Sequence, residues 1–193
     1  MKNNQLMIYG AYGYAGELMV REAVAQGLRP IIAGRDDEKL KPIATELSLE
    51  CRAFGVRNTG SNLQDISVLL NCAGPFSATA EPLARACLAQ QIHYLDITGE
   101  IDIFRKCHAL DEEARQQNVL ILPGAATLST TEIHPFHHLE PPNPLIRAIY
   151  TLPVVRCICK ILNSTNIANW RCFLHMTEKY HTSKFVWYFI LLT

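Results

Sequence analysis

A short apolar run followed by three evenly spaced glycines constrains this chain more than any other feature. Leu6–Tyr9 is long enough for one buried strand, Gly10, Gly13 and Gly16 follow it, and residues 17–26 carry a helical pattern. A strand, a tight glycine turn and a helix open a dinucleotide-binding unit. Gly10 can turn the chain sharply because it has no Cβ. The free amides of the first helical turn can then bind a diphosphate.

The spacing is G-x-x-G-x-x-G rather than the usual G-x-G-x-x-G, so the glycines alone leave an ordinary strand–turn–helix open. The rest of the chain alternates in the same way. Further strands are predicted at 30–33, 51–55, 67–72, 93–97 and 119–122, a polar loop at 57–64, and helices at 36–47, 79–90 and 101–117. This alternation predicts an α/β fold, namely a Rossmann-type doubly wound parallel sheet of about six strands in the order 3-2-1-4-5-6.

Two unusual loops fall at the same edge of this predicted sheet. In such a strand order the ligand crevice lies at the carboxyl ends of the first and fourth strands. The glycine turn follows the first strand, and Ala73, Gly74 and Pro75 follow the fourth. Small residues let a cofactor approach the backbone, so we expect the second loop to line the nicotinamide side. A plain strand-end turn is the alternative.

Arg35 directly follows the second predicted strand. An acidic residue near this place binds the ribose 2′-hydroxyl of NAD, whereas an arginine suits the 2′-phosphate of NADP. Arg35 therefore favours NADP(H) as the cofactor. NAD(H) is the alternative because Asp36 and Asp37 follow at once, and a solvent-facing arginine without a ligand is another interpretation.

Polar side chains also gather where the fifth predicted strand ends. Asp96, Thr98 and Glu100 are candidates for the substrate side of the crevice, where a carboxyl group could act as an acid or base or orient a substrate. In the alternative interpretation, Thr98 caps the next helix and Glu100 suits its first turn.

Composition limits the remaining classes of function. The chain has 193 residues, of which 49% are hydrophobic, and a formal net charge of zero, so we expect a packed core and no nucleic-acid groove. The first apolar run is too short for a signal peptide, and no segment supports a transmembrane span. The seven cysteines form no C-x-x-C pair, so reduced thiols and a cytoplasmic location are expected.

The character of the chain changes after residue 125. We divide it into a NAD(P)-binding domain at 1–125 and an irregular tail at 126–193, which has no glycine and no clear alternation of strands and helices. Tyr180 and Lys184 in the tail have the Tyr-x-x-x-Lys spacing of short-chain dehydrogenases, but chance explains it better. His134, His137 and His138 lack companions for a metal site, so no metal is predicted.

Four ordered motifs, Ile8–Gly16, Ala33–Arg35, Leu70–Phe76 and Tyr94–Glu100, resemble the saccharopine dehydrogenase-like oxidoreductases, most of all the trans-acting enoyl reductases. The resemblance covers residues 5 to about 125. It implies an NADP(H)-binding Rossmann domain and hydride transfer to or from a C=C, C=N or C=O bond of a small-molecule substrate, with a homodimer as one assembly to consider. It assigns no catalytic residue. It places cofactor contacts on Gly10, Tyr12, Gly13, Tyr14, Ala15, Gly16, Arg35, Ala73, Gly74 and Pro75.

The chain also departs from that family. Gly55–Asn58 lacks the usual acidic residue after the third strand, Ala80 stands where a glycine is usual, and no second, substrate-holding domain is recognisable after Gly124. These departures motivate a second hypothesis. The chain would be a nucleotide-binding fragment without turnover, acting as a sensor or interaction module or having no function.

Overall fold

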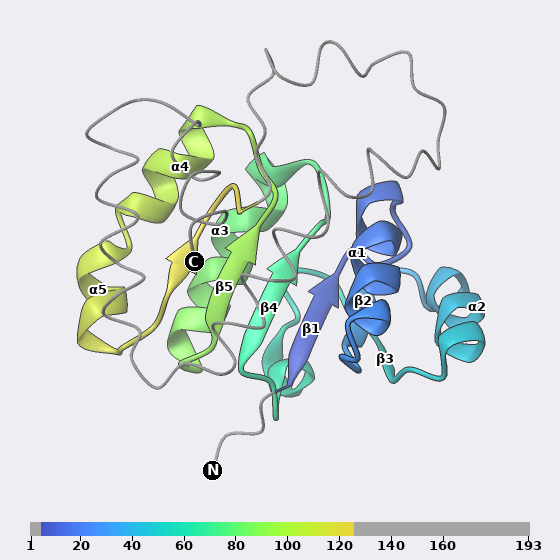
Figure 1. Cartoon of the computed structure of the whole chain (residues 1–193). Helices are drawn as coiled ribbons and strands as arrows, with labels where there is room; N and C mark the ends of the chain where they lie inside the picture. The colour runs from blue at the N-terminus through green and yellow to red at the C-terminus, as the bar shows by residue number, and fades with distance from the viewer. Residues whose placement is uncertain (1–4, 126–193) are drawn as a thin grey trace.

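The computed structural model describes residues 5–125, and within them six parallel strands form one sheet (Figure 1). The order is β3-β2-β1-β4-β5-β6, so the predicted fold class and strand order are confirmed. The strands are β1 (Leu6–Tyr9), β2 (Ile31–Gly34), β3 (Cys51–Ala53), β4 (Val68–Asn71), β5 (His93–Asp96) and β6 (Ile121–Leu122).

Helices cover both faces of the sheet, as expected for a parallel sheet whose strands are apolar throughout. Figure 1 shows α1 and α2 beside β1, β2 and β3, and α4 and α5 at the opposite end of the sheet. The helices are α1 (Tyr14–Ala25), α2 (Asp37–Leu47), α3 (Phe76–Ala89), α4 (Ile101–His108), α5 (Asp111–Gln116) and a short 3₁₀ helix, η1 (Gly60–Leu63).

The alternation of side chains along β1 divides the core into two clusters. Successive residues of a strand point to opposite faces. Leu6 and Ile8 accordingly pack with buried residues of α1 and α2. Met7 and Tyr9 pack with buried residues of α3, α4 and α5. β1, β2 and β4 are therefore buried on both sides, and only their ends are available for polar chemistry, whereas the edge strand β3 is partly exposed.

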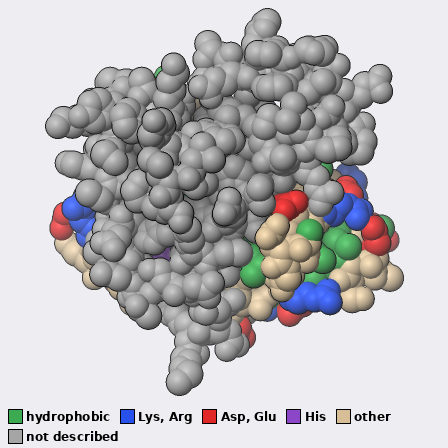
Figure 2. All heavy atoms as spheres, viewed as in Figure 1, with side chains coloured by type: hydrophobic (Ala, Val, Ile, Leu, Met, Phe, Trp, Pro, Cys, Tyr) green, Lys and Arg blue, Asp and Glu red, His purple; other side chains and the backbone are tan. Residues whose placement is uncertain are grey.

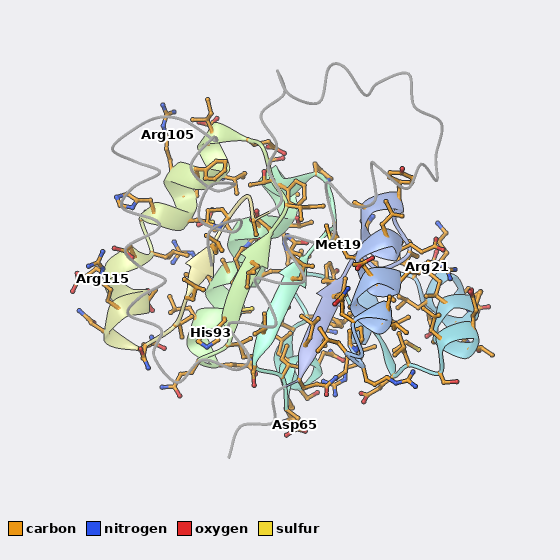
Figure 3. The ribbon with its side chains drawn as sticks, viewed as in Figure 1. Met19, Arg21, Asp65, His93, Arg105 and Arg115 are labelled. Atoms are coloured by element: carbon orange, nitrogen blue, oxygen red, sulfur yellow. The ribbon has the colours of Figure 1, made fainter. Side chains whose placement is uncertain are left out.

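Ion pairs on the outer surface involve side chains of α1 and α2. Arg21 of α1 donates to both carboxylate oxygens of Glu46 on α2, at 2.6 and 2.9 Å, and to Glu17 one helical turn away. Figure 2 shows basic and acidic side chains side by side over α1 and α2, and Figure 3 shows Arg21 between the two helices. The Arg21–Glu46 pair therefore links the two helices at their outer surface.

Two helices begin earlier than the sequence predicts. α1 begins at Tyr14 rather than at Glu17, and α3 begins at Phe76 rather than at Thr79. Gly16, which the sequence places just before the helix, lies inside its first turn. It has the packing role of the third glycine in such a motif, because an added Cβ would overlap the carbonyl oxygen of Gly10.

The predicted helix at 101–117 is two helices, which corrects that expectation. The Leu110 N–H donates to Cys107 O, three residues earlier in the chain. This 3₁₀-type bond tightens the turn between α4 and α5 and interrupts the i to i−4 hydrogen bonds of an α-helix. The predicted polar loop at 57–64 contains η1. Within residues 5–125, no helix combines the length and the apolar character needed to cross a membrane.

Gly16→Ala tests the closest backbone approach in the fold. An added Cβ would overlap the carbonyl oxygen of Gly10. Helix propensity alone would make this change stabilising by about 1 kcal/mol. We expect it instead to lower the free energy of unfolding by about 2–3 kcal/mol, because the overlapping atom is backbone and cannot swing away.

Urea denaturation followed by circular dichroism measures this effect. Gly55→Ala is the matched control, because nothing lies within 4 Å of the Cβ it would add. The control should stay within about 0.5 kcal/mol of the unchanged protein. A stabilised Gly16→Ala variant would contradict the packing described here.

Candidate functional site

Gly10 brings the loop after β1 against the loop after β4. Its φ is +84°, a backbone conformation that favours glycine. A Cβ on Gly10 would lie 2.7 Å from the amide nitrogen of Ala73 and 2.9 Å from the Cα of Ala73. The two loops that the sequence places at one crevice are therefore in direct contact, at the carboxyl ends of neighbouring strands.

The start of α1 presents backbone amides at this junction. The first bond of the helix runs from the Glu17 N–H to Gly13 O at 2.8 Å. Helix geometry therefore leaves the amides of Tyr14, Ala15 and Gly16 without a partner inside the helix. The N-cap residue is Gly13, which has no side chain to cap these amides. Amides in this arrangement, at the positive end of a helix dipole, bind diphosphate.

The loop after β1 is also fixed to the end of β2. The N–H groups of Gly10 and Ala11 both donate to Ala33 O, at 2.7 and 3.1 Å. The ring of Tyr12 covers Gly34 so closely that a Cβ there would lie 2.5 Å from a ring carbon. Three strand ends, those of β1, β2 and β4, thus converge around the glycine turn.

Arg35 lies beside this turn with its charge available. It is exposed and forms no ion pair with any residue among 5–125. Burial raises the pKa of Tyr9, the nearby hydroxyl of Tyr12 adds to this rise, and the positive charge of Arg35 opposes it. The guanidinium is therefore close enough to Tyr9 for its charge to act on that hydroxyl.

The two acidic residues after Arg35 have partners of their own. Asp36 is the N-cap of α2 and accepts a hydrogen bond from the Lys39 N–H at 3.3 Å. Asp37 forms an ion pair with Lys41 at 2.8 Å. Their presence favoured NAD(H) as an alternative in the sequence, but neither carboxylate neutralises Arg35 in the structure.

The structure places Asp96 in the interior. It is 0% exposed. Its Oδ1 accepts from the N–H groups of Thr98 and Gly124 at 3.0 and 2.8 Å, and its Oδ2 accepts from the Tyr94 hydroxyl at 2.9 Å. This carboxylate therefore joins the end of β5 to the end of β6. Burial raises the pKa of Asp96, although these three donors partly offset the rise.

Thr98 and Glu100 follow the capping interpretation in part. Glu100 is the N-cap residue of α4, its side chain is exposed, and its N–H donates to Thr98 Oγ1 at 3.1 Å. The structure therefore brings Asp96 and Thr98 together below the surface and leaves Glu100 outside. A role for these residues on the substrate side stays a prediction.

Sequence reasoning missed a set of buried polar residues beside the second loop. Asn71, Thr79 and Tyr94 are buried and hydrogen-bonded to one another. One signal could have revealed Asn71, because it is a polar residue that ends an otherwise apolar strand. Tyr180, Lys184 and the three tail histidines lie outside the described residues. Within residues 5–125, no group of three or more potential ligands could hold a metal ion.

Together, the strand order, the glycine turn and the uncapped amides that begin α1 define a dinucleotide-binding domain of the Rossmann class. Residues 6–122 match the family described as the saccharopine dehydrogenase NADP binding domain. The chain belongs to this family of oxidoreductases, which confirms the resemblance seen in the sequence.

Individual relatives agree with this assignment. A saccharopine dehydrogenase-like oxidoreductase from Rattus norvegicus is 26% identical over 141 residues, covering 61% of this chain and 33% of the relative. A proposed trans-acting enoyl reductase from Mycobacterium tuberculosis is 26% identical over 127 residues, covering 57% of this chain and 30% of the relative. Apo saccharopine dehydrogenase (L-Glu forming) from Saccharomyces cerevisiae shares the fold, with a TM-score of 0.54 at 11% identity, covering 62% of this chain and 26% of that chain. The chain spans about a third of the length of the curated relatives it matches.

Asp96→Asn tests the buried carboxylate. The folded protein should take up the Asp96 proton at a higher pH than the unfolded chain, because burial raises this pKa above its ordinary value of 3.8. Relative to the variant, the unchanged protein should therefore gain unfolding free energy as the pH falls through the raised pKa. The gain in unfolding free energy is complete once the pH lies below the pKa that Asp96 has in the unfolded chain.

Urea denaturation of both proteins at several pH values between 7 and 4 measures this difference. The variant should also be less stable at pH 7 by about 1–3 kcal/mol, because the Tyr94 hydroxyl loses its acceptor. A difference between the two proteins that does not change with pH would show that the pKa of Asp96 is not raised.

Proposed function

We propose that this domain binds NADP(H) in the crevice formed by the ends of β1, β2 and β4 and holds the nicotinamide for hydride transfer. The amides that begin α1 suit a diphosphate, and the small residues on either side admit a cofactor close to the backbone. The residues that would contact the cofactor are Gly10, Tyr12, Gly13, Tyr14, Ala15, Gly16, Arg35, Ala73, Gly74 and Pro75.

One observation carries the preference for NADP(H) over NAD(H). Arg35 is exposed beside the glycine turn, and the two acids that follow it pair with other groups. A guanidinium without an acidic partner among residues 5–125, close to the predicted ribose position, suits a 2′-phosphate. Lys39 lies in the same region, 5.6 Å from the centre of the Tyr12 ring, and pairs with Asp36 at 3.5 Å.

The cofactor would supply the hydride chemistry, and the protein would orient it. The proposed reaction is hydride transfer between the nicotinamide and a C=C, C=N or C=O bond of a small-molecule substrate. A cytoplasmic location and a homodimer are further expectations that accompany this proposal. Gly74 and Pro75 are exposed at the end of β4, where the nicotinamide would lie and a substrate would approach.

The second candidate function is nucleotide binding without turnover. The buried state of Asp96 favours it, because this carboxylate is fully occupied by three donors and cannot transfer a proton to a substrate as placed. In that case the domain would act as a sensor or interaction module. The two candidates share the cofactor site and differ only in the chemical step.

Arg35→Ala tests the cofactor preference. The variant should bind NADPH about tenfold to a hundredfold more weakly, the loss expected for a hydrogen bond between charged groups. NADH binding should change by less than about twofold, because NADH has no 2′-phosphate for this side chain to contact. Fluorescence titration of both nucleotides with the full chain measures the two affinities.

The matched control is Arg115→Ala on α5, which Figure 3 shows at the far end of the sheet from α1. Its affinities should equal those of the unchanged protein. Equal losses for both nucleotides in the Arg35→Ala variant would contradict the proposed contact with the phosphate. If the unchanged protein binds neither nucleotide, the proposed function is wrong.

Steady-state oxidation of NADPH separates the two candidate functions. The full chain is mixed with NADPH and a panel of enones, imines and carbonyl compounds, and absorbance at the nicotinamide band is followed. Turnover above the rate without protein supports the oxidoreductase. Tight binding with no turnover of any compound favours the sensor or interaction module.

A further inference from the structure

Ala73 is held on both sides by side chains from the interior. Its N–H donates to Asn71 Oδ1 at 3.0 Å, and its carbonyl accepts from the Thr79 hydroxyl at 2.6 Å. Asn71 is 0% exposed and Thr79 is 9% exposed, so water does not compete for these bonds. Neighbouring strands normally satisfy such backbone groups, but Ala73 lies beyond the end of β4 and takes side-chain partners instead.

Asn71 is itself held in one orientation. Its Nδ2 donates to Thr79 Oγ1 at 3.2 Å and to the Tyr94 hydroxyl at 3.1 Å. An amide nitrogen can only donate and an amide oxygen can only accept, so turning the side chain over would leave the Ala73 N–H facing a donor. The Tyr94 hydroxyl in turn donates to Asp96 Oδ2, so its proton points away from Asn71 and its oxygen accepts from Asn71 Nδ2.

The strand register explains how these residues meet. Asn71 lies opposite Asp96 in the parallel pair of β4 and β5. Tyr94 is two residues before Asp96 and therefore points to the same face. Thr79 comes from the first part of α3, which begins directly after the loop. Its hydroxyl donates to Ala73 O at 2.6 Å and, at 3.4 Å, to the carbonyl of the N-cap residue Pro75, whose own side chain makes no capping bond.

We propose that Asn71 and Thr79 are positioning residues that fix Ala73, and with it Gly74 and Pro75, for contact with the dinucleotide. This inference rests on the proposed function. Ala73 packs on Gly10, while Gly74 and Pro75 are exposed beyond the end of β4. A loop already fixed in this way loses little conformational freedom when the cofactor binds, and that preorganisation increases affinity.

Thr79→Val and Thr79→Ser form the test. Valine has the shape of threonine but no hydroxyl, so Ala73 O and Asn71 Nδ2 each lose a partner. We expect the affinities for NADPH and NADH to fall together by about fivefold to tenfold, which corresponds to one hydrogen bond. Serine keeps the hydroxyl and should restore both affinities to within about twofold of the unchanged protein.

Two further variants complete the experiment. Thr45→Val is the matched control, because Thr45 is an exposed threonine near the far end of α2; it should bind both nucleotides as the unchanged protein does. Thr79→Ala replaces the valine variant if that protein does not fold, since alanine suits a helix better. Urea denaturation without nucleotide is measured in parallel on every variant.

The outcomes separate this inference from the proposed function. Weaker binding of both nucleotides by the folded valine or alanine variant, with recovery in the serine variant, supports the positioning role. Unchanged affinities in a less stable variant show that Thr79 is merely structural, and failure of serine to restore binding also overturns the inference. If the unchanged protein binds neither nucleotide, the proposed function is wrong and the inference falls with it.

Discussion

The site depends on the close approach of three backbone segments that have no side chain between them. A Cβ on Gly16 would overlap Gly10 O, and a Cβ on Gly10 would lie 2.7 Å from the nitrogen of Ala73. Because Gly10 and Gly16 have no Cβ, the start of α1 can reach the ends of β1 and β4. The amides of the first helical turn can then face a crevice. With a side chain at either position, the helix would have to move away and the amides would no longer meet that edge.

Two polar residues at the carboxyl ends of neighbouring strands lie in the interior, and their side chains are paired. Asn71 and Asp96 are both fully buried, and every polar atom of their side chains has a partner. An unpaired buried polar group is costly, so such residues persist where the geometry satisfies them completely. The network costs little in stability because it is complete, and it lies directly beneath the loop that would contact the nicotinamide.

The sequence predicted the fold well because its strands are buried on both faces. Such strands appear as continuous apolar runs, and the helices between them leave few other arrangements. The same property hides the role of Asp96. Where both faces of a sheet are covered, a polar residue at a strand end can face the interior as readily as the crevice. Only the register that sets Asp96 opposite Asn71, and Tyr94 beside it, shows which occurs. The sequence placed the start of α1 three residues late, because glycine is a poor helix former and Gly16 lies in the first turn.

The two halves of the proposed cofactor site rely on different physics. On the side of β2, the contribution comes from exposed positive charge, at Arg35 and Lys39, and salt screens such charges over about 10 Å at ordinary ionic strength. On the side of β4, it comes from hydrogen bonds of buried groups, which salt screens far less. The choice between NADP(H) and NAD(H) would therefore depend on solution conditions, whereas the placement of the nicotinamide would not. Selectivity and orientation can then vary independently, because no residue of the buried network contacts the charged side of the crevice among the hydrogen bonds of residues 5–125.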